Sequence, residues 1–164
     1  MIGVIADTHE NVPKAKKAVE LFKSKNLDLV IHLGDVISPP TAKLFAGLKI
    51  KFIEGNNDGF LAKNPGIIRD VGGEFCGELL ELEHEGKKIC CFHGTDEKKL
   101  QKLIDSGKYD YVLTGHQHEP MDRKIGKTRV IRPGGFYLGN PEEWNQVVLL
   151  DVKNDKAEFI RISR

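Results

Sequence analysis

The segment from Tyr109 to His118 constrains this chain most, because it joins a short apolar run to two histidines separated by one residue. The run is of strand length, and Gly115 follows it where a strand would meet its loop. Side chains two positions apart on an extended segment point to the same side. His116 and His118 are therefore expected to face one site beside a glycine that leaves room there. The alternative is a pair of surface histidines in a loop.

Four other polar segments also follow an apolar run, and each includes or adjoins a glycine or another turn-forming residue. The apolar runs span residues 2–6, 27–33, 50–53 and 88–92. Any one of these segments is explained well enough as a turn. Five such signals in one chain are improbable as coincidence, and we predict a metal site. Its predicted ligands are Asp7, His9, Asp35, Asn56, His93, His116 and His118.

The first half of the chain alternates strands with helices. The pattern predicts strands over 2–6, 27–33 and 50–53, a helix that Asn11 caps and that runs through Phe22, and a second helix from Pro39 to Leu48. This repeat is typical of a parallel sheet with right-handed crossovers. Residues 60–73, which proline and glycine interrupt, are predicted to be a loop with at most one helical turn.

The second half of the chain is richer in antiparallel pairs. Hairpins are predicted for 79–84 with 88–92, for 121–125 with 128–131 and for 147–152 with 157–162. A helix is predicted over 98–104 and ends at Gly107. So many strands are unusual in a single sheet at this length. We therefore expect an α/β fold in which two mixed sheets pack face to face with helices outside.

Length and composition limit the classes of protein that this chain can represent. Its 164 residues are expected to form one domain over 1–164. A net charge of +1, with lysines spread among acids, argues against an obligatory nucleic-acid partner. The apolar runs are too short for a membrane span and the start lacks the features of a signal peptide, so a cytoplasmic location is predicted.

The three cysteines indicate neither a disulfide framework nor a thiolate zinc site, because no Cys-x-x-Cys spacing occurs. Cys90 and Cys91 lie in an apolar strand and are expected to be small buried hydrophobes. Two histidines outside the ligand set serve as comparisons. His32, inside a predicted strand, is expected in the core or beside a ligand that it orients. His84, beside a hairpin turn, is expected to be exposed.

The predicted ligands provide oxygen and imidazole donors without sulfur. Such a mixture suits Mn²⁺, Fe²⁺, Zn²⁺, Co²⁺ or Ni²⁺. Seven ligands are too many for one ion with an open position but sufficient for two ions that share a carboxylate. Two such ions about 3.5–4 Å apart can hold a hydroxide between them and clamp a phosphoryl oxygen during in-line displacement.

Five sequence blocks together resemble the calcineurin-like metallophosphoesterases, and most closely the compact single-domain phosphodiesterases of bacteria and archaea. The blocks are Asp7-x-His9, Gly34-Asp35, Gly55-Asn56, His93-Gly94 and Gly115-His116-x-His118, in this order over nearly the whole chain. The resemblance implies a four-layer α/β/β/α sandwich. It also implies hydrolysis of a small-molecule phosphodiester by a hydroxide that bridges two divalent ions, of which Mn²⁺ is the first expectation. By family analogy, the chain is expected to form a homo-oligomer.

The resemblance also distributes the ligands and names the catalytic residues. One ion would take Asp7, His9, Asp35 and His118, and the second would take Asp35, Asn56, His93 and His116. Asp35, Asn56, Asn57 and His116 are the expected catalytic residues.

Two departures from the family pattern bear on mechanism. The position after the motif asparagine is usually a histidine that helps the leaving group depart, and here it is Asn57. An amide has no proton to give at neutral pH, so poor leaving groups are expected to react slowly. Arg132-Pro133-Gly134-Gly135 stands where the small relatives often carry Asn-Pro-Gly-Ser. A surface or interface role is expected for Arg132, with contact to substrate phosphate as the alternative.

The substrate and the native metal stay open at this point. Phe136, Tyr137 and Trp144 are expected to line a rim of the site or an oligomer contact. A phosphomonoesterase with the same metals is the alternative enzyme, and a protein-binding scaffold of the same fold is the alternative outside enzymes. All seven predicted ligand positions carry side chains that can coordinate a metal, which favours the enzyme.

Overall fold

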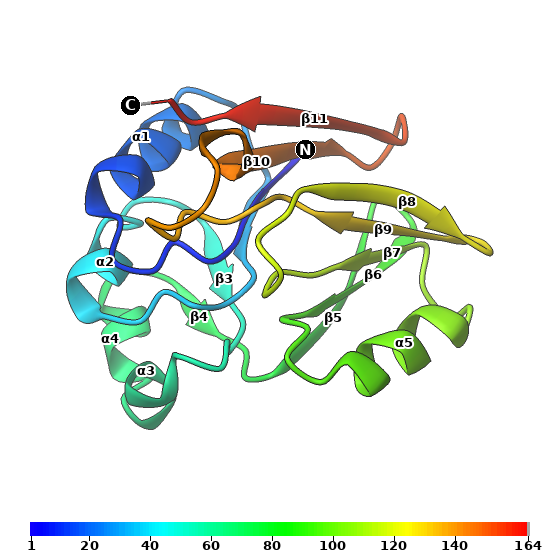
Figure 1. Cartoon of the computed structure of the whole chain (residues 1–164), viewed down its shortest axis with the longest axis horizontal. Helices are drawn as coiled ribbons and strands as arrows, with labels where there is room; N and C mark the ends of the chain where they lie inside the picture. Colours follow the sequence, from blue (N-terminus) through cyan, green and yellow to red (C-terminus); the bar gives the residue numbers. More distant parts are fainter. Residues whose placement is uncertain (164) are drawn as a thin grey trace.

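The computed structural model describes residues 1–163, which form two mixed β-sheets with helices on their outer faces (Figure 1). The first sheet has the order β11-β10-β1-β2-β3-β4. Its strands are β1 (Ile2–Ile5), β2 (Leu29–His32), β3 (Ile50–Phe52), β4 (Glu74–Phe75), β10 (Gln146–Asp151) and β11 (Lys156–Arg161). The second sheet has the order β5-β6-β7-β9-β8. Its strands are β5 (Leu79–His84), β6 (Lys87–Phe92), β7 (Tyr111–Leu113), β8 (Met121–Ile125) and β9 (Thr128–Arg132).

Parallel pairing brings the ends of several strands to one edge of each sheet. In the first sheet β1, β2, β3 and β4 are parallel, while β10 and β11 add antiparallel pairs at one side. In the second sheet β6, β7 and β9 are parallel, and the hairpin partners β5 and β8 flank them. The loops that follow parallel strands therefore emerge together, which is where open α/β sheets bind ligands.

Helices α1 to α4 lie on one side of the molecule and α5 on the other (Figure 1). Their bounds are α1 (Val12–Lys23), α2 (Pro39–Lys43), α3 (Gly59–Lys63), α4 (Gly66–Asp70) and α5 (Glu97–Asp105), with a 3₁₀ turn over Glu142–Trp144. The predicted cap of α1 is present, because the Asn11 side chain accepts the N–H of Lys14. Among the described residues, none of the helices is long and apolar enough to cross a membrane.

Three hydrophobic clusters occupy the three interfaces between four layers. Phe22 of α1 and Phe45 of the turn after α2 pack onto the first sheet. Ile31 of the first sheet and Leu113 of the second lie in the cluster between the sheets, and Ile104 of α5 packs with Val130. The predicted four-layer α/β/β/α architecture is thereby confirmed. Cys90 and Cys91 are both fully buried, as predicted, on opposite faces of β6.

The prediction for residues 60–73 was wrong, because this region contains α3 and α4 and leads into β4. Leu61 and Ile68 are buried in the cluster between the helices and the first sheet, which we call the helix-side core. Helices this short are stabilised by tertiary packing of one face, which the local sequence pattern does not reveal. The second predicted helix is also shorter than expected: α2 ends at Lys43, and turns continue the chain to Leu48.

The expectation that His84 is exposed was also wrong. Its side chain is only 18% exposed, and its Nε2 lies 3.3 Å from Oδ2 of Asp28. His84 continues the alternation of Leu80 and Leu82, which pack between the sheets, and so reaches the residue before β2, far away in the sequence.

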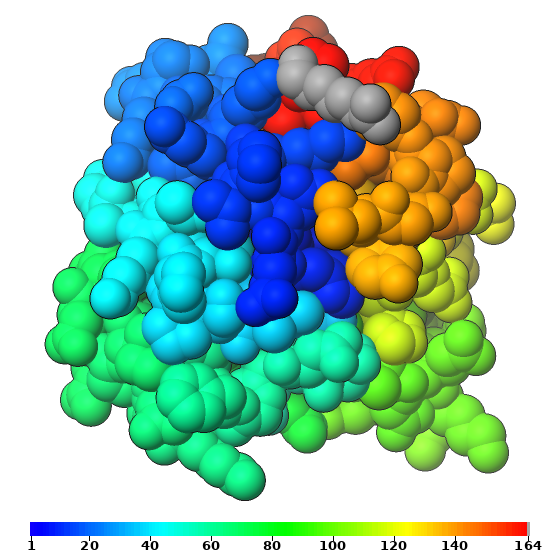
Figure 2. All heavy atoms as spheres, turned by 60° about the vertical axis from the view of Figure 1, so that its left-hand side comes forward, coloured from blue at the N-terminus to red at the C-terminus, as the bar shows by residue number. Residues whose placement is uncertain are grey.

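The start of the chain and the segment around residue 140 lie side by side on one face of the molecule. Figure 2 shows them in dark blue and orange. The Asn11 side chain donates to the carbonyl of Phe136 at 2.8 Å, and Lys14 pairs with Glu142 at 3.0 Å. These contacts fix the segment after β9 next to the loop after β1.

Candidate metal centre

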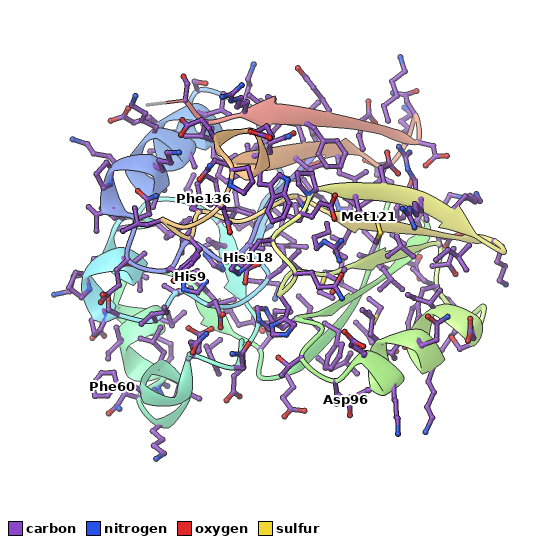
Figure 3. All side chains as sticks on the ribbon, viewed as in Figure 1. His9, Phe60, Asp96, His118, Met121 and Phe136 are labelled. Atoms are coloured by element: carbon purple, nitrogen blue, oxygen red, sulfur yellow. The ribbon has the colours of Figure 1, made fainter. Side chains whose placement is uncertain are left out.

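The seven predicted ligands gather where the strand ends of the two sheets meet. Asp7, His9, Asp35 and Asn56 follow β1, β2 and β3 of the first sheet, and His93, His116 and His118 follow β6 and β7 of the second. Figure 3 shows His9 and His118 near the middle of the molecule, and their Nε2 atoms are 3.4 Å apart. His9 and His118, which are 109 positions apart in the sequence, thus share one site.

Asp35 directs its two carboxylate oxygens toward different histidines. Its Oδ2 lies 3.8 Å from Nε2 of His9, and its Oδ1 lies 3.7 Å from Nε2 of His93. The carboxylate is almost completely buried. A carboxylate that bridges two cations needs this arrangement, with one oxygen for each group of ligands.

Asp7 is fully buried and has one oxygen without a hydrogen-bond donor. Its Oδ2 accepts the N–H of His116 at 3.0 Å. Its Oδ1 has no hydrogen-bond partner within residues 1–163. The Nε2 atoms of His118 and His93 lie 3.5 and 3.8 Å from this oxygen. A buried carboxylate oxygen without a donor is costly, and a cation between these atoms would satisfy it.

Three side chains converge on the side-chain oxygen of Asn56. Nε2 of His93 and Nδ1 of His116 each lie 3.1 Å from this oxygen, and Oγ1 of Thr95 lies 3.3 Å from it. Asn56 itself is exposed, so this end of the site opens to solvent.

Hydrogen bonds at the outer nitrogen orient two of the histidines. Nδ1 of His93 donates to the carbonyl of Leu33 at 2.6 Å, and Nδ1 of His118 donates to Oδ1 of Asn140 at 3.1 Å. Both rings therefore turn Nε2 toward the carboxylates, which is how metal-binding histidines are commonly fixed. The Asp7 carboxylate is the main cause that raises the pKa of His118, whereas burial lowers the pKa of His9.

These residues fit a pair of divalent cations. Ligand atoms of Asp7, His9 and His118 lie within 4.8 Å of one another, as do those of Asp7, Asp35 and His93. Carboxylate and imidazole donors, together with the donor-free oxygen of Asp7, suit first-row divalent ions. The described cysteines Cys76, Cys90 and Cys91 take no part in these two groups.

The backbone of the site adopts a left-handed conformation that residues other than glycine rarely take. Five of the seven predicted ligands have positive φ, and strain of this kind concentrates at functional sites. The five are Asp7 (φ 50°), His9 (47°), Asp35 (59°), His116 (68°) and His118 (59°).

Two positions require glycine because their backbone lies too close to a carboxylate to leave room for a side chain. A Cβ on Gly55 would lie 2.3 Å from Oδ1 of Asp35, and a Cβ on Gly115 would lie 2.8 Å from Oδ2 of Asp7. The predicted room beside His116 therefore accommodates the carboxylate of Asp7.

Asp58 holds two of the loops together, and sequence reasoning missed it. Its Oδ2 accepts the N–H groups of Asp35 at 2.7 Å and of Gly55 at 2.9 Å, and its Oδ1 accepts that of Ile37 at 2.8 Å. Burial raises the pKa of Asp58, although these three donors act in the opposite direction. Its position directly after Asn56-Asn57 is the signal that could have identified it.

His32 is fully buried and links the loop after β1 to the loop that carries Asp35, in agreement with its predicted role. Its Nδ1 accepts the N–H of Gly34 at 3.2 Å, so its Nε2 carries the proton and donates to Oγ1 of Thr8 at 3.0 Å. Thr8 lies between Asp7 and His9, and Gly34 precedes Asp35. Burial is the largest cause that lowers the pKa of His32, to about 3, so the ring is neutral.

Asn57 contacts Asp35 in two places. Its backbone N–H donates to Oδ1 at 2.9 Å and its side-chain amide donates to Oδ2 at 2.8 Å. The side chain thus orients the carboxylate.

The predicted surface or interface role of Arg132 was wrong. Only 7% of this residue is exposed, and its guanidinium donates to the carbonyl of Glu119 and to Oε1 of Gln117. Phe136 was also expected at a rim but is fully buried in the helix-side core. Tyr137, its neighbour, is 53% exposed. Arg132 is buried because it bonds to the loop of residues 117–119, and Phe136 because its backbone bonds to Asp7 and Asn11 beside α1.

Comparison with known proteins assigns the family. The model of the calcineurin-like phosphoesterase superfamily domain matches residues 1–155. The chain belongs to this superfamily. A phosphodiesterase of Methanocaldococcus jannaschii is 33% identical over 163 residues, which cover 90% of this chain and 98% of the relative. The resemblance inferred from the five sequence blocks is therefore confirmed.

Solved structures agree with this assignment. The structure of an archaeal phosphodiesterase has a TM-score of 0.87 at 30% identity and covers 98% of both chains. Vps29 of Chaetomium thermophilum has a TM-score of 0.70 at 13% identity, covering 99% of this chain and 98% of that one, and shows a shared fold alone. With the family established, the predicted chemistry of metal-dependent phosphoester hydrolysis is confirmed.

Proposed function

We propose that this protein is a phosphodiesterase that works with two divalent metal ions. The observation that carries the proposal is Asp35, whose two oxygens face His9 and His93 separately. The similar archaeal proteins named as phosphodiesterases support the choice of a diester over a monoester.

The ligands divide into two sets that share Asp35. We assign Asp7, His9, Asp35 and His118 to one ion, and Asp35, Asn56, His93 and His116 to the other. Mn²⁺ is the proposed metal, with Ni²⁺, Fe²⁺, Co²⁺ and Zn²⁺ as alternatives, because oxygen and imidazole donors suit all of them. The cytoplasmic location and the homo-oligomer stay predictions from the sequence.

When bound, the ions would neutralise charge on the phosphoryl oxygens and lower the pKa of water that attacks phosphorus. Asn56 and His116 lie at the exposed end of the site, where their N–H groups can donate to a phosphoryl oxygen. Asn57 holds Asp35 in position through two hydrogen bonds. An amide at this position donates no proton to the departing alcohol. Substrates with acidic alcohols, such as aryl diesters, are therefore the ones expected to react fastest.

The test is hydrolysis of a diester and its monoester by protein from which a chelator has removed metals. Bis(4-nitrophenyl) phosphate and 4-nitrophenyl phosphate are compared with Mn²⁺, Ni²⁺, Mg²⁺ or no metal added. We expect turnover of the diester with transition metals only, and its loss in Asp35→Asn and His116→Ala. Asp70→Asn, which changes an exposed carboxylate outside the site, is the matched control.

Two results would contradict the proposal. Preference for the monoester would identify a phosphomonoesterase. Inertness toward both substrates with every metal, in protein shown to be folded, would favour a protein-binding scaffold.

A further inference from the structure

A cavity of about 480 Å³ lies beside the metal centre, on the side of His9 and His118. Tyr137, Leu138 and Asn140 form one wall, and Lys14 and Lys17 of α1 line the other. Figure 2 shows the two segments concerned, dark blue and orange, side by side on one face.

The cavity adjoins the predicted ligands through Tyr137 and Asn140, which line it, although the predicted ligands themselves do not. The ring centroid of Tyr137 lies 5.4 Å from that of His9 and 5.9 Å from that of His118. Asn140 accepts the hydrogen bond from Nδ1 of His118 and donates to the carbonyl of Gly135 at 3.0 Å. A group attached to a phosphate at the metal centre would therefore meet Tyr137 at the border of this cavity.

The wall formed by Tyr137 and Leu138 is apolar and held in place. Tyr137 is 53% exposed and Leu138 is 85% exposed. The segment before them is anchored, because the N–H of Phe136 donates to the carbonyl of Asp7 at 2.8 Å and Asn11 donates to the carbonyl of Phe136. An exposed aromatic and an exposed aliphatic side chain on a fixed segment beside a reactive centre indicate a binding surface.

The amines on the opposite wall already have partners. Lys14 pairs with Glu142 at 3.0 Å, and Lys17 donates to the carbonyl of Ser163 at 3.2 Å. The groups that the cavity offers to a ligand are therefore the ring of Tyr137 and the side chain of Leu138, rather than the ammonium groups of Lys14 and Lys17.

A second cavity, of about 400 Å³, lies on the other side of the centre and differs in character. Glu54, Glu78 and Asp96 line it together with Asn56, His93 and the nearly buried ring of Phe92. Lys99, which also lines it, pairs with Glu78 at 3.1 Å. Three carboxylates make this side unfavourable for an apolar ring, because they would lose hydration beneath it. The ring is better accommodated on the Tyr137 side.

We propose that the Tyr137 cavity binds an aromatic ester group of the phosphodiester substrate, with the ring against Tyr137 and Leu138. This inference rests on the proposed function and adds the class of ester that the enzyme prefers. The aromatic contact and the burial of two apolar side chains supply the preference over a small alkyl ester.

Calorimetric binding of phenylphosphonate and methylphosphonate to the Mn²⁺-loaded protein tests the inference. Both carry one substituent on phosphorus through a carbon bond that the enzyme does not hydrolyse. We expect the wild type to bind phenylphosphonate about tenfold more tightly than methylphosphonate. Tyr137→Ala is expected to bring the two affinities within about twofold, and Tyr137→Phe to keep most of the difference because the ring is retained.

Phe60→Ala is the matched control. Phe60 is 58% exposed on α3 and lines neither cavity, and Figure 3 shows it far from His9 and His118. The tenfold preference is expected to persist in this variant. Equal affinities in the wild type, or an unchanged ratio in Tyr137→Ala, would overturn the inference.

Turnover of bis(4-nitrophenyl) phosphate by the same preparations separates this inference from the proposed function. Diester turnover without any preference for the phenyl group would overturn the inference alone. Absence of diester turnover in the wild type with every metal would overturn the proposed function. A dimer in sedimentation that Leu138→Arg splits into monomers would show that a second copy covers the wall, and would also overturn the inference.

Discussion

Arg132 donates a hydrogen bond from Nη1 to Oε1 of Gln117 at 2.9 Å, beneath the loop that carries both histidines of the Gly-His-x-His block. The same guanidinium donates from Nε to the carbonyl of Glu119. Gln117 in turn donates to Glu97 at the start of α5, at 3.3 Å. Because residues 117 and 119 flank His118, these bonds hold the loop in its left-handed backbone conformation.

Arg132→Ala should weaken metal binding although Arg132 is not a ligand. Loss of the residues that orient ligands commonly lowers metal affinity by about 10- to 100-fold. Titration of chelator-stripped protein with Co²⁺, followed by its visible absorption, measures this affinity. Arg132→Lys should recover only part of the loss, because an ammonium group lacks the planar fork that reaches both acceptors.

Arg129→Ala is the control for loss of charge from the same strand. Arg129 lies three positions earlier on β9 and bonds to Asp122 and Asp155, away from the histidine loop. Its removal should leave Co²⁺ affinity unchanged. Equal weakening in both variants would mean that the loop does not depend on Arg132.

Acid should destabilise the metal-free protein through His32. Its pKa is about 3 in the folded chain and about 6.5 when unfolded, so the unfolded chain binds a proton first as the pH falls. The free energy of unfolding should therefore decrease between pH 6.5 and pH 3, by about 2 kcal/mol at pH 5 from this group alone. Urea unfolding at a series of pH values measures the slope.

His32→Asn removes this titration while its side-chain oxygen can still accept the N–H of Gly34. The variant should be less stable at pH 7.5, because the bond to Thr8 is lost, but its stability should vary less with pH below 6.5. Identical slopes for the variant and the wild type would refute the assignment to His32.

Asn57→His should increase turnover of diesters with poor leaving groups. A positioned acid typically accelerates such reactions by at least about a hundredfold, whereas aryl diesters need little help. The ratio of kcat for methyl and aryl diesters measures the effect. Asn57→Ala provides the comparison, since it also loses the amide bond to Asp35 but supplies no proton. An equal ratio in both variants would exclude proton donation at this position.

Asp7→Asn should have opposite effects on the stability of the metal-free protein and on its metal binding. Without metal, the variant should be more stable than the wild type by about 1–3 kcal/mol, because a buried charge without a donor is removed. Mn²⁺ at a hundredfold excess over its Kd should stabilise the wild type by about 2.7 kcal/mol for each site. The gain from the ion assigned to Asp7 should largely disappear in the variant, while the gain from the other ion should remain. Thermal unfolding with and without Mn²⁺ measures both effects, and an unchanged gain would exclude Asp7 as a ligand.

Most strands and the gathering of the predicted ligands could be predicted from the sequence, for one physical reason. Parallel strands of one sheet end at the same edge, so the polar residues after β1, β2 and β3 lie near one another, as do those after β6 and β7. Packing of the two sheets face to face then brings the two groups together. Apolar runs in the sequence predict these strands directly. Helices α3 and α4 escaped prediction because their stability comes from burying Leu61 and Ile68 against distant strands.

The roles of Asp58, Arg132 and Phe136 depend on contacts between loops. Asp58 bonds to backbone groups 21 to 23 positions away, and Arg132 bonds to residues 13 and 15 positions away. Side-chain type alone does not reveal such partners. The left-handed backbone of Asp7 and His9 is equally hidden, since these residue types adopt other conformations far more often.

Each proposed ion takes ligands from both sheets, because Asp7, Asp35 and Asn56 belong to one sheet and His93, His116 and His118 to the other. Bound ions would therefore act as crosslinks across the sandwich, and the pair His9 and His118 would close a loop between positions 109 apart. Crosslinks that close long loops remove the most freedom from an unfolded chain. Separating the two sheets would then require breaking coordination bonds first. The reaction centre would therefore also resist mechanical separation of the two sheets.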